Sequence, residues 1–173
     1  MQESGIEFFE KLMAFRIKKV LLVASVYDSF MFADDDMLSE VLFEHNLTGR
    51  EHFYIKRVAH PNEALEVLSE EKFDIVISMT WLLDYDMKNF ISTVKDRFSI
   101  PFVLLSFSFT DINLIDDEIK DKIDEIFLWQ GDTRIFSSII NLIEDRINFE
   151  KDIACGVQFV LLVEDNISFY SKY

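Results

Sequence analysis

The sequence predicts an α/β fold in which one parallel sheet is covered by helices on both of its faces. The first reason is that short, continuous runs of apolar residues recur along the chain, as in strands that are buried on both sides. The second reason is that segments with apolar residues at helical spacing separate these runs. Strand and helix patterns alternate five times, which is typical of a parallel sheet.

Five strands are expected in this sheet. The first is the run Val-Leu-Leu-Val-Ala at residues 20–24, and a weaker strand covers residues 53–58. The other three are predicted at residues 73–78, 101–106 and 125–129, where apolar residues again dominate. None of these runs is long enough to cross a membrane.

Helical patterns separate the strands. Residues 35–44 follow an acidic start that suits a helix N-terminus, and residues 62–68 follow Pro61, which is favoured in a first turn. The strongest pattern covers residues 133–149, with Asp132 as the expected N-cap. Two further helices are predicted at residues 87–97 and 111–123.

Another amphipathic helix is expected near the N-terminus. Apolar residues at positions 6, 9, 12, 13 and 15 recur at roughly helical spacing. Such a helix packs either on the main body of the same domain or on a partner, and the pattern does not distinguish the two. Residues 1–16 are therefore assigned to an N-terminal helix.

The charge balance excludes several classes of partner. The chain has 17 basic and 32 acidic residues, a formal net charge of −15, which repels nucleic acids and anionic membrane surfaces. Its single cysteine, Cys155, cannot form an internal disulfide and fits a reducing compartment. With no signal-peptide pattern at the N-terminus, we expect a cytoplasmic protein with neither nucleic acid nor membrane as partner.

The five strand–helix units resemble a response-regulator receiver domain. This resemblance implies a flavodoxin-like, doubly wound sheet with strand order 2-1-3-4-5, formed here by residues 17–150. Receivers carry an acidic pair after the first strand, a phosphoacceptor Asp after the third, a hydroxyl after the fourth and a Lys after the fifth. These groups hold Mg²⁺ and stabilise the phosphoryl oxygens.

This sequence departs from that pattern at nearly every chemical position. Ala24 and Ser25 stand where the acidic pair is expected, and Met79 stands at the phosphoacceptor position. Trp129 occupies the Lys position, and only the hydroxyl is kept, as Ser106. A thioether neither accepts a phosphoryl group in this chemistry nor binds Mg²⁺ well. The resemblance therefore implies a pseudo-receiver with no metal, no cofactor and no catalytic residue. Trp81 and Trp129, which close the third and fifth strands, are expected to fill the vacated pocket.

Other polar residues of the chain are poor substitutes for the lost site. Only acids in loops near the strand ends could supply the missing carboxylates. Acids at such positions more commonly lie in solvated turns or at the start of a helix. The histidines are dispersed and lack ligand partners at metal-site spacing, and no glycine-rich phosphate loop follows the first strand. The residues concerned are Asp28, Asp34, Asp35, Asp36, Asp84, Asp86, His45, His52 and His60.

The C-terminal tail predicts the start of a second domain. Residues 151–156 are expected as a linker, and residues 157–163 as a strand that begins a truncated second receiver spanning 157–173. Residues 160–165 align with residues 20–25, but the tail has the acidic pair, Glu164 and Asp165, that the first copy lacks. The tail therefore predicts tandem receivers, the first degenerate and the second with its acids in place.

A second, narrower resemblance concerns the wider protein. Residues 24–30, 127–132, 143–148 and 163–171 are similar to the N-terminal region of bacterial proteins related to phosphoenolpyruvate synthase. This resemblance implies two receiver-like domains in front of a nucleotide- and pyruvate-binding portion. It covers none of that catalytic portion, so this chain is not expected to be an enzyme.

The function expected from these features is protein interaction. A pseudo-receiver would serve as a dimerisation or relay module in a two-component-type signalling protein, with a second copy, another protein or neighbouring domains as partner. Two alternatives remain at this point. One is a phosphorylatable regulator that uses an unconventional acid such as Asp28 or Asp84, and the other is a module that binds a nucleotide or flavin.

Overall fold

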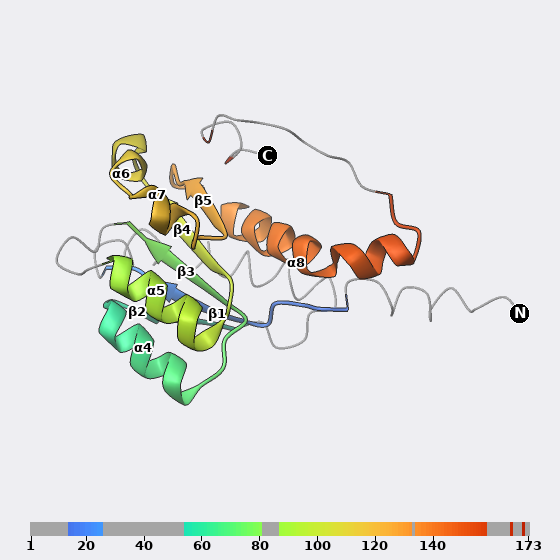
Figure 1. The fold of residues 1–173 in the computed structure, drawn as a ribbon, viewed down its shortest axis with the longest axis horizontal. Coiled ribbons are helices and arrows are strands. Elements are labelled where there is room, and N and C mark those ends of the chain that lie inside the picture. Colours follow the sequence, from blue (N-terminus) through green and yellow to red (C-terminus); the bar gives the residue numbers. More distant parts are fainter. Residues whose placement is uncertain are drawn as a thin grey trace, which may run out of the picture.

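A five-stranded parallel sheet forms the centre of the computed structural model, which describes residues 14–25, 54–80, 87–132, 134–158, 167 and 171. The strand order β2-β1-β3-β4-β5 confirms the predicted fold class. Figure 1 shows the strands side by side, with their carboxyl ends at one edge. The strands are β1 (Lys19–Val23), β2 (Tyr54–Val58), β3 (Ile75–Met79), β4 (Phe102–Ser106) and β5 (Glu125–Leu128).

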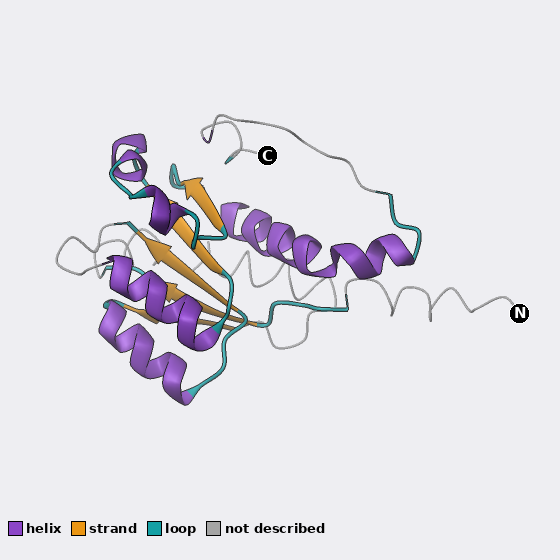
Figure 2. Ribbon diagram, in the orientation of Figure 1, coloured by secondary structure: helices purple, strands orange, loops and turns teal. Residues whose placement is uncertain are grey.

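Helices cover both faces of this sheet (Figure 2). On one face lie α4 (Pro61–Glu70) and α5 (Met87–Phe98), each following the strand before it. The other face is covered by α8 (Arg134–Ala154), which runs back from the carboxyl edge and continues beyond the amino edge (Figure 1). Within the described residues, no helix is both long and apolar enough to cross a membrane.

Two apolar cores result from the alternation of side chains along each strand. In β1, Val20 and Leu22 belong to the core beneath α8, whereas Leu21 and Val23 belong to the core beneath α4 and α5. All four side chains are at most 1% exposed. Continuous apolar strands are therefore needed here, because neither face of the sheet meets solvent.

The helix predicted at residues 111–123 is wrong as a single element. The structure has two short helices, α6 (Phe109–Asn113) and α7 (Asp117–Lys120). Ser108 starts α6 early, because its side chain accepts a hydrogen bond from the Thr110 N–H at 3.1 Å. Asp116 then adopts an extended ψ of 143° at the N-cap of α7, which interrupts the helical path.

The predicted boundary at the end of α8 is also wrong. The helix continues to Ala154, so most of the expected linker at residues 151–156 is its last turn. Gly156, two residues after the end of the helix, has a φ of 84°, the left-handed conformation that favours glycine after a helix. The sequence pattern predicts too short a helix, because Asn148 and Asp152 are polar and would be expected to face solvent. In the structure both side chains are buried.

Several predicted elements fall wholly or partly outside the described residues. Residues 14–16, the end of the expected N-terminal helix, are not helical, and the rest of that helix is not described. The helix at 35–44 also lies outside the description. Val157 and Gln158 are not in a strand, and the other residues of the expected tail strand are outside it, as are Glu164 and Asp165. The division into two domains stays a prediction.

Candidate functional site

The parallel register brings the predicted site positions together at the carboxyl edge of the sheet. Val23 of β1 pairs with Ser78 of β3, so Ala24 and Met79 come next on adjacent strands. On the other side of β3, Met79 pairs with Leu105, and the next N–H, that of Thr80, donates to the Leu105 carbonyl at 3.0 Å. The carboxyl edge is where doubly wound sheets bind their ligands.

The fifth strand joins the same edge through Trp129. Its N–H donates to the carbonyl oxygen of Ser106 at 2.7 Å, one residue beyond the pair Ser106–Leu128. The positions predicted from the ends of β1, β3, β4 and β5 therefore stand in one row.

Apolar side chains fill this row. Ala24, Met79 and Trp129 belong to one buried cluster, with exposed fractions of 1%, 1% and 2%. The ring of Phe107 tilts against the indole of Trp129, with 5.2 Å between their centroids. Three positions that carry charge in receivers are thus part of the core beneath α8. Such surroundings disfavour an unpaired phosphoryl group or metal ion.

The indole of Trp129 is also held by a hydrogen bond. Its Nε1–H donates to the backbone carbonyl oxygen of Asp132 at 3.0 Å, which satisfies the one polar group of the side chain. The Asp132 carboxylate in turn accepts the N–H of Arg134 at 3.0 Å, so its predicted capping of α8 is confirmed. The Arg134 side chain, together with its backbone N–H, holds the pKa of Asp132 below its usual range.

This shift predicts a weak pH dependence. Asp132→Asn keeps a capping oxygen but removes the charge, so we expect a loss of less than about 1 kcal/mol of unfolding free energy at pH 7, because the pair is exposed. A lowered carboxyl pKa contributes above the unfolded value of about 3.9 and is lost as pH falls through the folded pKa. Urea unfolding of both proteins should therefore differ at pH 7 and converge in acid. A difference that grows in acid would contradict this assignment.

Ser106, the one receiver-like polar group that is kept, is engaged within the fold. Its side chain is fully buried and donates to the Ser108 carbonyl oxygen at 2.9 Å. The Ser106 hydroxyl also accepts the Ser108 N–H at 3.3 Å and the Thr80 hydroxyl at 3.4 Å. These contacts order the turn that leads into α6. Ser25, which stands with Ala24 where the acidic pair is expected, is half-buried.

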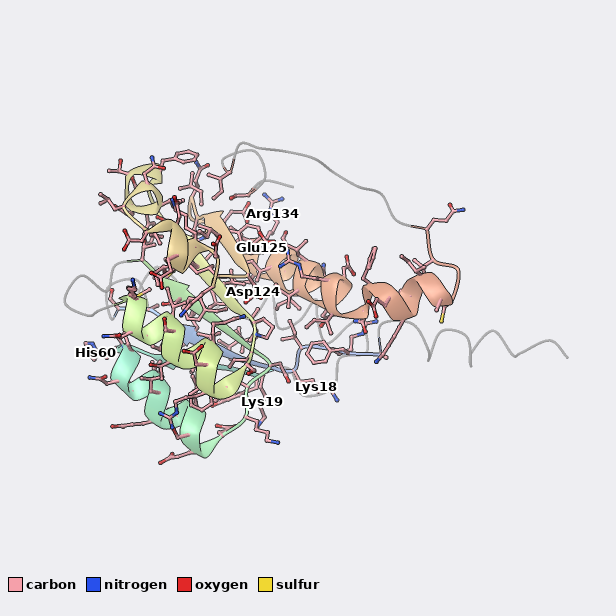
Figure 3. The ribbon with its side chains drawn as sticks, viewed as in Figure 1. Lys18, Lys19, His60, Asp124, Glu125 and Arg134 are labelled. Atoms are coloured by element: carbon pink, nitrogen blue, oxygen red, sulfur yellow. The ribbon has the colours of Figure 1, made fainter. Side chains whose placement is uncertain are left out.

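Metal-binding residues do not gather in the described part of the chain. Nowhere in it do three His, Cys, Asp or Glu side chains come together in a way that could hold a metal ion. His60 is exposed and is the N-cap residue of α4, but its side chain makes no capping hydrogen bond (Figure 3). The remaining acids and histidines weighed from the sequence, and Trp81, lie outside the described residues. Cys155, which was expected in a linker, follows the last turn of α8 and is half-buried.

The amino edge of the sheet carries charged side chains instead. Figure 3 shows Lys18 and Lys19 at the beginning of β1, and both backbone N–H groups donate to Asp74 at 2.8 Å. The Lys19 ammonium bonds to Glu71 at 2.7 Å, which raises the pKa of Lys19 and lowers the pKa of Glu71. A cavity of about 510 Å³ lies at this same edge, between the ends of α4 and α5. No residue predicted for the receiver site lines this cavity.

Sequence reasoning missed a polar ladder on α8. Glu144 and Asn148 are fully buried, and both bind the extended segment that precedes β1. Ile17 donates its N–H to the Glu144 carboxylate at 2.7 Å, and Phe15 donates its N–H to the Asn148 carbonyl oxygen at 2.8 Å. The only signal was their spacing of four residues, which a solvated helical face would share.

The fold is that of response-regulator receiver domains. A CheY-like receiver domain from Methylobacillus flagellatus superimposes with a TM-score of 0.55 at 17% identity, over 73% of this chain and 98% of that one. The response regulator TrrA from Thermotoga maritima, in complex with Mg²⁺ and BeF, gives 0.55 at 16% identity, over 73% and 99%. A structure described as adenylate cyclase from Rhodopirellula baltica gives 0.57 at 10% identity, over 80% and 97%.

Sequence comparisons add nothing to this likeness. No protein-family model matches the chain, and no curated protein sequence matches it. At these identities the structural similarity establishes the fold alone. The resemblance to the N-terminal region of phosphoenolpyruvate synthase-related proteins finds no support in these comparisons and stays a prediction.

Proposed function

We propose that this chain is a pseudo-receiver, a receiver-fold module that is not phosphorylated and that works through protein contacts in a two-component-type signalling protein. The proposal has two parts. The first is the loss of phosphoryl chemistry at the carboxyl edge of the sheet. The second is a role in dimerisation or in relay to neighbouring domains.

The apolar filling of the carboxyl edge is the observation that carries the first part. Phosphoryl transfer to a receiver needs a nucleophilic carboxylate, a metal held by oxygen ligands and a cation for the phosphoryl oxygens. Met79 offers a soft sulfur in place of the carboxylate, and Ala24 offers no ligand. Trp129 brings a neutral donor that is already bonded to the Asp132 carbonyl oxygen. Each group therefore lacks the property that its position requires.

Exposed apolar side chains near the fourth and fifth strand–helix units support the second part. Leu114, which follows α6, is 79% exposed, and Phe109 and Ile147 are 42% and 43% exposed. Receiver domains commonly associate through faces near these units. Large exposed apolar side chains of this kind are typical of protein contact surfaces when they lie near one another.

Acetyl phosphate provides the direct test of the first part. Incubation of the full chain with acetyl phosphate and Mg²⁺ is expected to add no phosphoryl group. Met79 stands at the acceptor position, and no group of His, Cys, Asp or Glu in the described residues could hold a metal ion. Intact mass measured before and after incubation checks this result. A receiver with its Asp and acidic pair in place, treated in parallel, shows that the reagent is active.

A gain of one phosphoryl group would contradict the proposal if it disappears in Asp28→Asn or Asp84→Asn, because an unconventional acid would then be the acceptor. Stabilisation of the chain by a nucleotide or flavin in a thermal-shift assay would instead favour a ligand-binding module.

Sedimentation of the full chain over a range of concentrations tests dimerisation, and Leu114→Ser is expected to weaken it. A chain that stays monomeric at all concentrations would remove the homodimer from the proposal.

A further inference from the structure

The cavity at the amino edge of the sheet has an apolar floor. α4 and α5 lie side by side and end at this edge (Figure 1), and after each of them the chain turns into a strand. Leu68 and Phe73 are 6% and 4% exposed, and Phe98 and Ile100 pack against the same core cluster. The volume of about 510 Å³ lies within the range of sites that bind small molecules.

Arg97 presents a guanidinium group on the α5 side of the cavity. Its Cζ lies 5.2 Å from the centroid of the Phe98 ring, and its side chain forms no ion pair or hydrogen bond with the described residues. A guanidinium that lies over an aromatic ring keeps its N–H donors in its own plane, where they can bind a carboxylate with two parallel hydrogen bonds. Lys72 adds a second cation to the lining, and it too has no ionic partner in the part of the chain that the structure describes.

The α4 side of the cavity carries the opposite charge. α4 ends at Glu70, and the C-terminal end of a helix has a partial negative charge. The Glu70 carboxylate lines the cavity and pairs with none of the described residues. Glu71 is different, because its carboxylate bonds to Lys19 at 2.7 Å and lies 3.5 Å from the Lys56 ammonium. The lining therefore offers an anion on one side and cations for an opposite charge.

A ligand with a single charge fits this lining poorly. A simple carboxylate would bind Arg97 but would also face Glu70 and the end of α4, and a simple ammonium would meet the reverse problem.

A zwitterion satisfies both sides, and an aromatic body matches the rings of Phe73 and Phe98 on the floor. We propose that this cavity binds an α-amino acid with an aromatic side chain, its carboxylate at Arg97 and Lys72 and its ammonium at Glu70. The site lies at the opposite edge of the sheet from the receiver positions. The inference goes beyond the protein contacts proposed above and does not depend on the loss of phosphorylation.

Three ligands of similar shape separate the contributions of the two charges. L-Phenylalanine carries both charges, phenylpropanoate lacks the ammonium group, and phenethylammonium lacks the carboxylate. Each is titrated into the full, isotope-labelled chain, and the NMR shifts of the amides in residues 68–73 and 97–100 are followed. We expect L-phenylalanine to bind on the order of tenfold more tightly than either analogue, because each analogue leaves one charged side of the cavity unpaired.

Two results of these titrations would overturn the proposal. One is the absence of shifts in these amides at up to about 10 mM L-phenylalanine, which would show that the cavity does not bind an amino acid. The other is equal or tighter binding of a single-charge analogue, which would show that the lining does not select a zwitterion.

Charge-removing variants of the full chain test the assigned contacts. Arg97→Gln is expected to weaken the binding of L-phenylalanine on the order of tenfold and not to weaken phenethylammonium, which has no carboxylate. Glu70→Gln should weaken L-phenylalanine and not phenylpropanoate. Lys120→Gln is the matched control, because it removes a cation of α7 that pairs with Asp117 and does not line the cavity. This control should leave all three affinities unchanged.

Unfolding midpoints of the three variants show that each is folded. Equal weakening of L-phenylalanine and phenethylammonium by Arg97→Gln would mean that the guanidinium does not hold the carboxylate. An effect of Lys120→Gln as large as that of Arg97→Gln would mean that overall charge, and not the cavity, decides binding. Either result would overturn the proposal.

Discussion

Replacing Trp129 by Ala is expected to lower the free energy of unfolding by about 3–5 kcal/mol. The side chain is 2% exposed and belongs to the same cluster as Ala24 and Met79, so its removal leaves a large cavity at the carboxyl edge. The substitution also removes the donor that binds the Asp132 carbonyl oxygen at 3.0 Å. Urea or guanidinium unfolding, followed by circular dichroism, measures the loss.

Gln130→Ala is the matched control, because Gln130 is the exposed neighbour of Trp129. We expect that substitution to change stability by no more than about 0.5 kcal/mol. If Trp129→Ala were equally benign, the indole would not be filling the site. Trp129→Lys should also be strongly destabilising, because it buries an ammonium group without the carboxylates that accompany it in receivers. Restoring one receiver residue alone is therefore not expected to restore phosphorylation.

Asn148→Ala is expected to cost about 2–4 kcal/mol. The Asn148 amide accepts from the Phe15 N–H, donates to the Phe15 carbonyl oxygen and donates to the Glu144 carbonyl oxygen. The substitution would leave buried backbone groups without these partners, and an unsatisfied buried group is costly. Equilibrium unfolding measures the total loss, and hydrogen exchange at Phe15 and Ile17 reports whether the segment has detached.

Asn141→Ala controls for the effect of the residue type on α8. Asn141 lies in the same helix but is exposed, so we expect a change within about 0.5 kcal/mol. The exchange of the Phe15 and Ile17 amides should stay unchanged in this control. A loss for Asn148→Ala no larger than that of the control would show that the ladder does not hold the segment before β1.

The strands were predictable because most of them are buried on both faces of the sheet. A strand buried on both faces tolerates few polar residues, so β1, β3 and β4 appear in the sequence as continuous apolar runs. The edge strand β2 was the weaker prediction, and its burial is indeed lower, with Tyr54 45% exposed. Site positions at strand ends followed from the same runs, since the residue after each run lies at the carboxyl edge.

Helix boundaries were less predictable, because the competing local signals are small. A side-chain cap contributes about 1 kcal/mol, and such a contribution from Ser108 begins α6 before the predicted helix. At the end of α8, the predicted helix stops at residue 149, whereas the structure continues it to Ala154. Glu144, Asn148 and Asp152 are polar, so the pattern assigns them to solvent, but the structure buries all three.

The sequence by itself determined the α/β class, the five strands and the identity of the residues at the carboxyl edge. It did so because burial on both faces of a sheet imposes a periodicity that is local in the chain. Only the tertiary structure decided that Trp129 and Met79 share one core and that Glu144 and Asn148 bind residues 15–17. The contacts of Glu144 and Asn148 with residues 15–17 join positions more than a hundred residues apart, as in the Ile17–Glu144 pair, separated by 127 residues. Periodicity tells which face of a helix is apolar, but the partner of a buried polar group depends on which segment the fold brings against it.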